Sequence, residues 1–365
     1  MRTRRTWGRL LAALAVALVA AVGFVPRAAQ ATEGNVAKIG DKEYPSLAAA
    51  VAAVPADGAE ATIVLTDDIK MTTSDIVTIK KGQNVRLELN GHTISAVKGQ
   101  FNGRAIVNNG TLVVNGDGGG TIDVSMAGSG GQGSITNTAG SLTIESGSFR
   151  GSPTSEKANI WNNTGATLDI KGGRFDTSCT AVGAYLGSKT SISGGYFESP
   201  WYPTIDNSGE MTITGGEFVN TSCSACNAGT THWGYTIRSG QYSDQAHLDI
   251  KYATVTGTQG GVSTIGGTAD IYDGVFKTVE CLHNHGAVFY ALYVAGESYE
   301  TSTTVYGGTF SSEKREAVHV GNNNAGGDGG NRQHATLEIK GGSFTGGDKN
   351  TTAVAVDNAL GGASI

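Results

Sequence analysis

Cysteine and histidine side chains form the clearest chemical groups in this sequence. Two groups combine thiols with imidazoles at spacings typical of zinc ligands: Cys223, Cys226 and His232, and Cys281, His283 and His285. Thiolate and imidazole are common ligands of structural zinc sites. Paired by oxidation, the same cysteines would instead form disulfides. The compartment of the protein and the elements that carry these residues decide between the two chemistries.

The N-terminal segment indicates export. Residues 1–31 combine an arginine-rich start, an apolar run over 10–25 and a small-residue cleavage site at 29–31, which predicts a signal peptide. Residues 3–7 resemble a twin-arginine signal, and an ordinary secretory signal fits equally well. The apolar run is short for a membrane span. We therefore expect a secreted or cell-surface protein, with no membrane insertion after signal cleavage.

A phrase of the form Leu-x-Ile-x-Gly-Gly-x-Phe recurs along the chain. Its copies end at Phe149, Phe175, Phe197, Phe218, Phe276, Phe310 and Phe344, and the shortest step between them is 21 residues. Apolar and polar residues alternate on both sides of the glycines, which is typical of short strands. A fixed period of this kind predicts a repeat architecture.

A third strand-like piece precedes each phrase, as at 105–109, 134–137 and 159–163. Three short strands cannot bury a core alone, but coils stacked about 4.8 Å apart can share one. We therefore predict an all-β fold, a parallel β-helix solenoid with three strands per coil and about eleven coils. The glycine pairs fit sharp corners, and the asparagines fit corners or a ladder of stacked amides.

The start of the mature chain differs from the repeats. Residues 45–54 predict an alanine-rich helix with Leu47, Val51 and Val54 on one face, suited to cap the first coil. The predicted organisation is a signal peptide at 1–31, a cap and first coil at 32–100, and β-helix repeats at 101–365. Because the repeat is still running at Ile365, we expect a longer protein, with an anchor or binding modules beyond.

The N-terminal segment 39–94 and the run of glycine-phenylalanine phrases give a family resemblance. Together they resemble secreted bacterial surface proteins with a right-handed parallel β-helix, the pectin-lyase-like fold, over nearly all of 36–365. The resemblance implies a right-handed solenoid. Its relatives include polysaccharide lyases, glycoside hydrolases and adhesins, so it implies no single activity.

The repeat gives the cysteines positions around the coil. Cys179, Cys223 and Cys281 each follow a phrase-ending residue by four or five positions, with one coil between successive members. Two coil spacings are about 9–10 Å, so a loop must bend to join a pair. For an exported protein we favour disulfides Cys226–Cys281 and Cys179–Cys223. The zinc site formed by the six ligands above, and free thiols, are the alternatives.

One outward column of the repeat mixes aromatic and charged residues, a combination that suits glycan binding. Together with Trp233 at its edge, it predicts a binding face made of Trp161, Asp206, Arg238, Tyr293, His319 and Trp233. Scattered surface aromatics without function are the alternative.

A second outward column carries Asp169, Asp249, Asp270 and Glu338. Glycoside hydrolysis uses a pair of carboxylates. Lysines follow three of these acids by two positions, which favours a charge-paired, solvated face. Hydrolases of the resembled fold carry clustered aspartates with Gly-His-Gly and Arg-x-Lys motifs, and this sequence has none of them.

We therefore predict a non-catalytic adhesin or binding stalk, without cofactor, whose partners are glycans or host or microbial surface proteins. A net charge of −6 argues against nucleic-acid binding. The alternatives are a polysaccharide lyase or glycoside hydrolase with its site near His283 and His285, and a structural spacer. Insertions at 220–234, 280–303 and 321–335 are expected to decorate one side and carry specificity.

Overall fold

The computed structural model describes only part of the chain. The described residues are 34–127, 133–153, 157–176, 178–222, 234–279, 290–297, 299–321, 333–347, 352–356 and 363–364. All of them except Gly34 belong to one compact unit, Asn35–Ile365. The predicted signal peptide lies outside the described residues.

A small cap precedes the first coil. Strands β1 (Ala37–Ile39) and β2 (Lys42–Tyr44) pair antiparallel, and helix α1 (Leu47–Ala52) follows. The Ser46 side chain accepts a hydrogen bond from the Ala49 N–H at 3.1 Å and so caps the helix. The buried face of α1 packs on β1, β2, β3 and β5, as predicted for a capping helix.

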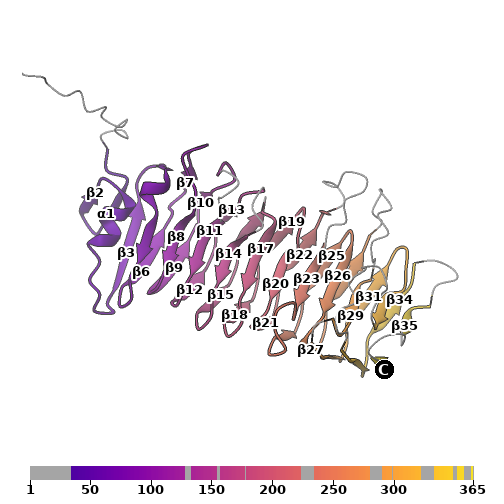
Figure 1. The fold of residues 1–365 in the computed structure, drawn as a ribbon. Helices are drawn as coiled ribbons and strands as arrows, with labels where there is room; N and C mark the ends of the chain where they lie inside the picture. Colours follow the sequence, from indigo (N-terminus) through magenta and orange to yellow (C-terminus); the bar gives the residue numbers. More distant parts are fainter. Residues whose placement is uncertain are drawn as a thin grey trace, which may run out of the picture. The chain divides into compact units, whose positions relative to one another are not determined.

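The rest of the unit is a right-handed parallel β-helix, in which strands of successive coils lie side by side (Figure 1). Sheet A begins with β2 and β1 and continues through β3 (Glu60–Leu65), β6 (Asn84–Glu88), β9 (Thr111–Asn115), β12 (Ser141–Ile144), β15 (Thr167–Ile170), β18 (Lys189–Ile192), β21 (Glu210–Ile213), β24 (His247–Ile250), β27 (Gly267–Ile271), β30 (Thr301–Val305), β33 (Ala335–Ile339) and β36 (Ala363–Ser364).

The other two sheets are parallel throughout. Sheet B contains β4 (Ile69–Met71), β7 (Thr93–Ala96), β10 (Thr121–Asp123), β13 (Ser148–Arg150), β16 (Arg174–Asp176), β19 (Tyr196–Ser199), β22 (Glu217–Asn220), β25 (Thr254–Gly257), β28 (Val275–Thr278), β31 (Thr309–Ser312) and β34 (Ser343–Thr345). Sheet C contains β5 (Val77–Ile79), β8 (Arg104–Asn108), β11 (Gly133–Asn137), β14 (Ala158–Asn162), β17 (Thr180–Ala184), β20 (Ile205–Asn207), β23 (Tyr235–Ser239), β26 (Gly260–Thr264), β29 (Leu292–Val294), β32 (Val318–Val320) and β35 (Val354–Val356). A 3-10 turn, η1 (Thr73–Asp75), precedes β5.

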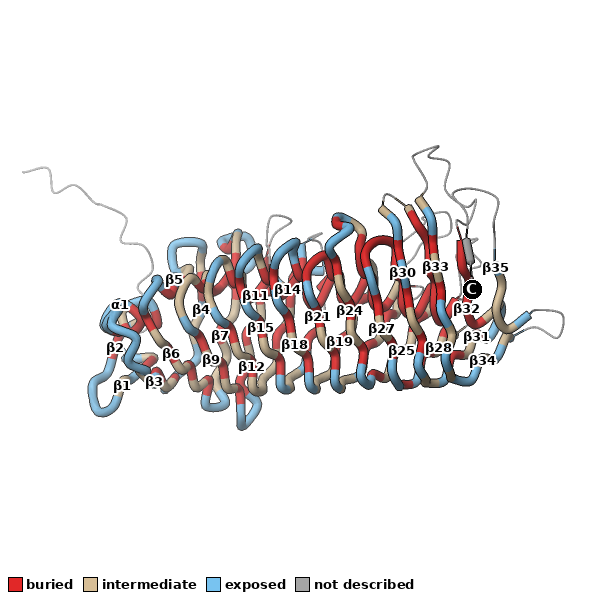
Figure 2. Tube along the Cα trace, turned by 90° about the horizontal axis from the view of Figure 1, so that it is seen from below, coloured by how far each residue is buried: buried red, intermediate tan, exposed pale blue. Residues whose placement is uncertain are grey.

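Sheets B and C each hold eleven strands within the described residues, which confirms the predicted number of coils. The coils begin with β3, β4 and β5, before the first copy of the phrase. Along most strands of sheets A and B, buried positions alternate with half-exposed or exposed ones (Figure 2), whereas β17, β26, β29 and β32 of sheet C are buried at every position. The interior is therefore one continuous apolar column shared by all coils.

The phrase-ending phenylalanines stack inside this column. The ring centroids of Phe149 and Phe175 lie 5.0 Å apart, those of Phe175 and Phe197 4.7 Å, and those of Phe197 and Phe218 4.9 Å. All four rings are fully buried. The ring spacing matches the strand spacing, so each of these four coils adds one ring to the stack, whereas Val255 takes the position in the next coil.

The glycine pair turns the corner between sheets A and B. Gly195, the second glycine of one pair, has φ +112°, a conformation that side chains rarely adopt. A β-carbon on the first glycine, Gly194, would lie 2.7 Å from the Lys171 carbonyl oxygen of the preceding coil. The two glycines are needed for different reasons: one for backbone conformation and the other for the close approach of coils.

The asparagines that end the sheet C strands form the predicted amide ladder. The Asn108 amide donates to the Asn137 side-chain oxygen at 2.8 Å, and the Asn137 amide donates to Asn162 at 2.9 Å. All three side chains are buried. Because each amide pairs with the next coil, buried polar groups are satisfied where the chain leaves sheet C.

Two of the three predicted insertions, 220–234 and 321–335, lie largely outside the described residues. The third, predicted at 280–303, is wrong in its bounds, because β29 and the first residues of β30 fall within it. In chain order, 223–233 and 280–289 separate a strand of sheet B from a strand of sheet C, whereas 322–332 separate β32 of sheet C from β33 of sheet A.

Candidate binding surface on sheet C

Strand registers place the predicted binding residues in one outward column of sheet C. Gly183 stands between the first two members and Ser263 between the third and fourth. From β14 to β32, the column holds Trp161, Asp206, Arg238, Tyr293 and His319. Trp233 lies outside the described residues. The registers confirm that the five described residues share one column, but their side chains differ widely in exposed fraction.

Asp206 and Arg238 form a bidentate pair in the middle of the column. The Arg238 Nε lies 3.1 Å from Asp206 Oδ1, and Nη2 lies 2.9 Å from Oδ2. The Arg238 side chain is only 10% exposed, and the Asp206 side chain is 18% exposed. Burial opposes the Arg238 charge, but the attraction and hydrogen bond of Asp206 outweigh it and raise the arginine pKa. Arg238 therefore stays ionised, and the two hydrogen bonds fix the orientation of both side chains.

The far end of the column is packed rather than open. Tyr290 stacks on His319 with centroids 4.5 Å apart, and Tyr235 stacks on Tyr293 at 5.7 Å. His319 Nδ1 lies 2.9 Å from Glu316 Oε1. Burial raises the pKa of both Tyr235 and Tyr290, so their phenols stay neutral. Tyr293 and His319 are buried, which corrects the expectation that the whole column is a flat, accessible face.

The near end of the column is accessible. The Trp161 ring lies 5.9 Å from Tyr185, centroid to centroid, at an interplanar angle of 44°. Tyr185 is 48% exposed, and Trp161 is half-buried. A β-carbon at Gly183 would lie 2.6 Å from the indole carbons Cε3 and Cζ3, so only glycine lets the indole lie over β17.

A third exposed ring lies beside the Asp206–Arg238 pair. Tyr242 is 61% exposed, and the Arg238 guanidinium carbon lies 6.0 Å from its ring centroid. The Arg238 Nη1 also donates to Gln241 at 3.2 Å. Trp161, Tyr185, Asp206, Arg238 and Tyr242 thus follow the border between sheets C and A. We refer to these five residues as the aromatic edge.

Sequence reasoning missed Tyr185 and Tyr242 because both follow a sheet C strand instead of lying within one. The signal available was a change of residue type at the corner. The position of Tyr185 is occupied by Ser208 one coil later and by Gly240 in the coil after that. The repeat alone does not require a tyrosine at this exposed corner, where the next two coils carry small residues.

A buried cation lies beside Trp161. Arg104 Nη1 donates to the Ala158 carbonyl oxygen at 2.7 Å, and the guanidinium carbon lies 6.0 Å from the indole centroid. Burial lowers the pKa of Arg104 to about 9. Backbone carbonyls and an aromatic face therefore replace a carboxylate as its partners.

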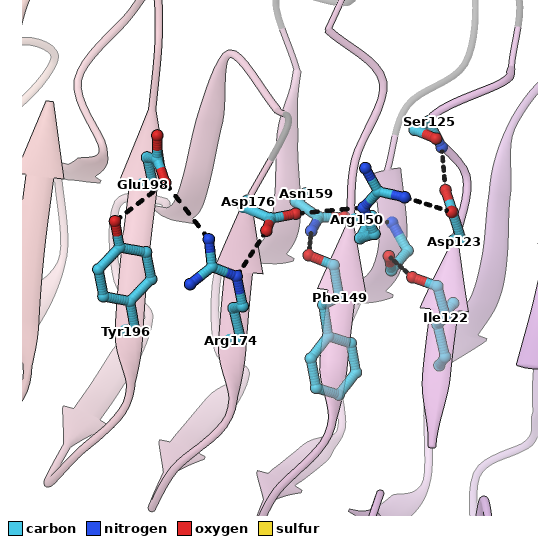
Figure 3. Close-up of polar contacts among 11 residues, drawn as sticks. Ile122, Asp123, Ser125, Phe149, Arg150, Asn159, Arg174, Asp176, Tyr196 and Glu198 are labelled. Atoms are coloured by element: carbon cyan, nitrogen blue, oxygen red, sulfur yellow. Dashed lines mark hydrogen bonds and ion pairs between the residues drawn. The ribbon is translucent and has the colours of Figure 1, made fainter. Parts of the chain in front are cut away.

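A charged ladder on sheet B offers a contrast (Figure 3). Arg150 bridges Asp123 at 3.0 Å and Asp176 at 3.4 Å, and Arg174 lies 2.7 Å from Asp176. The hydrogen bond with Asp176 raises the Arg174 pKa. The Tyr196 hydroxyl closes the ladder by donating to Glu198 at 2.9 Å. Acids and bases satisfy one another here, so the ladder stabilises adjacent coils.

The acidic column of sheet A is also paired, in part. Asp169, Asp249, Asp270 and Glu338 share one register position, as predicted. Lys251 lies 2.9 Å from Asp249 and Lys340 3.1 Å from Glu338, whereas Lys171 reaches Glu145 at 3.9 Å. A shallow hollow of about 300 Å³ is lined by Asp169 and Glu210, and Glu210 is paired with Lys189. Two of the four acids in this column, Asp249 and Glu338, are therefore paired with a lysine.

Only one cysteine, Cys179, is described. It is buried, and its Sγ lies 3.3 Å from the Pro153 carbonyl oxygen. No disulfide lies wholly within the described residues, and each predicted pair, Cys226–Cys281 and Cys179–Cys223, includes a cysteine outside them. The alternative zinc ligands all lie outside as well: Cys223, Cys226, His232, Cys281, His283 and His285. Within the described ranges, no cluster of acids, histidines and cysteines could hold a metal ion.

Comparison of this chain with family models, curated proteins and solved structures finds no match. Among the described residues, no helix has the length and apolar character needed to span a bilayer. Function must therefore be argued from the surface itself.

Proposed function

We propose that this protein is a secreted or cell-surface, non-catalytic binding protein that recognises carbohydrate through the aromatic edge. The proposal rests on one observation above all. Two rings from adjacent coils, Trp161 and Tyr185, lie 5.9 Å apart and partly open to solvent, close to a fixed ion pair. The N-terminal signal pattern supports export.

The chemistry of this surface suits a sugar. Pyranose rings have apolar C–H faces, which pack on aromatic faces, and peripheral hydroxyls, which exchange hydrogen bonds with charged groups. The Asp206–Arg238 pair offers oxygen acceptors and N–H donors that are already fixed in orientation. Rigid rings and a locked pair lose little conformational entropy on binding.

The arrangement favours an extended chain of sugars over a single one. The aromatic edge runs from β14 to β23, which is three coil spacings or about 14 Å along the solenoid. Rings at its two ends would therefore contact different residues of one oligosaccharide. The buried residues Tyr293 and His319 lie beyond this edge and do not belong to it.

A glycan array with matched variants tests the proposal. We expect the wild-type chain to bind an oligosaccharide and Trp161→Ala and Tyr185→Ala each to weaken that binding by about tenfold or more, equivalent to about 1.4 kcal/mol. Tyr252→Ala is the control, because Tyr252 is 46% exposed but follows β24 of sheet A. Folding of each variant is checked by circular dichroism.

The outcomes separate this proposal from its alternatives. Absence of glycan binding by the wild-type chain would refute the proposal and leave a structural spacer. Glycan binding that is unaffected by both Trp161→Ala and Tyr185→Ala would refute the aromatic edge as the binding site. Release of new reducing ends from a polysaccharide would indicate a lyase or hydrolase.

A further inference from the structure

A second pair of exposed rings lies on the border between sheets A and B. Tyr272 directly follows β27 and Tyr306 directly follows β30, and the register of Ile271 with Val305 brings them side by side. Their centroids are 4.5 Å apart at 6°, the closest ring pair in the described residues together with Tyr290–His319. The two tyrosines are 37% and 39% exposed.

Lysines cover the outer faces of this pair. Lys251 Nζ lies 3.5 Å from the Tyr272 centroid, and Lys340 Nζ lies 4.9 Å from the Tyr306 centroid. In register order the column therefore reads lysine, tyrosine, tyrosine, lysine. No ring face is left for a sugar to stack on. Each phenol nevertheless keeps a solvent-accessible part and has the other phenol as its aromatic neighbour.

We propose that Tyr272 and Tyr306 form an oxidative cross-linking site, converted to an intramolecular dityrosine by hydrogen peroxide and a peroxidase. The peroxide takes one hydrogen atom from each phenolic O–H and is reduced to two water molecules. The two phenoxyl radicals then join through a new C–C bond between ring carbons ortho to the oxygens. Those carbons release their hydrogens as protons and the oxygens take up protons, so the pair loses two hydrogens in total.

Proximity and exposure together select this pair. Coupling requires two radicals within contact distance, and the stacked rings already lie 4.5 Å apart, so rotation of the two side chains can bring their ortho carbons together. The stacked pair Tyr235–Tyr293 is further apart, at 5.7 Å, and Tyr293 is only 5% exposed. A bond between residues 272 and 306 would close a loop of the chain across adjacent coils. Closing a loop restricts the unfolded chain, so the modification would hold together coils that depend on neighbour contacts.

The test treats the full-length mature chain, at low concentration, with peroxidase and hydrogen peroxide. Tryptic peptides 252–277 and 278–314 contain Tyr272 and Tyr306 respectively. We expect the monomer to yield these peptides joined and lighter by two hydrogen atoms, with fragmentation placing the link at Tyr272 and Tyr306. The thermal midpoint of the cross-linked monomer should rise.

Three variants make the test decisive. Tyr272→Phe and Tyr306→Phe should each abolish the link, whereas Tyr293→Phe, in the same peptide as Tyr306, should leave it intact. A link that survives Tyr306→Phe, or oxidation that yields only intermolecular dimers, would overturn the inference. Glycan binding plays no part in this experiment, so its outcome is independent of the proposed function.

Discussion

The phenylalanine column inside sheet B and the mixed column outside sheet C are built by the same stacking of coils, yet they carry different information. Inside, Phe149, Phe175, Phe197 and Phe218 repeat one residue type, and all are fully buried. Outside, Trp161 is half-buried, Asp206 and Arg238 form an ion pair, and the column ends in packed rings.

The difference follows from what each position must satisfy. An inward residue has to fill the same space in every coil, because a change of volume leaves a cavity or a clash. An outward residue is limited only by its neighbours in the column. Departures from the repeat are therefore tolerated outside, and Gly183 beneath Trp161 shows that one departure can require another.

Truncating an inward ring should have the largest effect. Phe197→Ala removes a fully buried ring from between two others, 4.7 and 4.9 Å away, and should lower the free energy of unfolding by about 3–5 kcal/mol. Tyr185→Ala, on the outside, should change it by no more than about 0.5 kcal/mol. Urea denaturation of both variants measures the contrast. Similar losses would mean that the outward ring is also a core residue.

The amide ladder should come next. Asn137→Ala leaves the buried side-chain oxygen of Asn162 without its donor, whereas the Asn108 amide keeps its hydrogen bond to the Ser141 carbonyl oxygen. Each unsatisfied polar group costs about 1–3 kcal/mol, so we expect a loss in that range by the same denaturation measurement. Asn84→Ala is the control, since Asn84 is half-buried and lies outside the ladder. An unchanged unfolding midpoint for Asn137→Ala would contradict a stabilising ladder.

Alanine substitutions at two corner glycines distinguish backbone strain from steric crowding. Gly195→Ala places a β-carbon at φ +112°, where it would also lie 3.1 Å from the Gly173 carbonyl oxygen, and should lower the free energy of unfolding by about 1–3 kcal/mol. Gly165 also has positive φ, +76°, but a β-carbon there would meet nothing within 4 Å. Gly165→Ala should therefore show the smaller loss, about 1–2 kcal/mol, expected for a left-handed backbone alone. Equal losses would show that crowding contributes nothing at Gly195.

The smallest effect should come from an outward ion pair of sheet A. Arg86 lies 2.6 Å from Glu145, and its hydrogen bond lowers the Glu145 pKa. A lowered carboxyl pKa stabilises the fold above the ordinary value, about 4.3, and the contribution disappears as pH falls through the lowered pKa.

We therefore expect Arg86→Gln to lose about 0.2–1 kcal/mol at pH 7 and to approach wild-type stability in acid. Unfolding midpoints measured across pH check this. A difference that persists unchanged at pH 2 would indicate packing, not charge.

Much of the fold could be predicted from the sequence. The phrase with its glycine pair indicated strands, corners and coil number, and the asparagines indicated the ladder, because a period of identical inward residues permits few other structures. The outward column of sheet C was predicted in the correct register as well. Its exposure was not predicted, because burial of Tyr293 and His319 depends on Tyr290 and Tyr235, which approach from outside the column.

The sequence by itself determined how the chain stacks, because local patterning and strand spacing act on each coil in the same way. Only the tertiary structure decided which departures from the repeat meet in space. Tyr185 and Tyr242 join Trp161 along one edge, and Tyr272 meets Tyr306, because coil stacking brings residues separated by one or more coils of sequence within contact distance. That separation varies with every insertion, so no fixed spacing in the sequence marks these pairs.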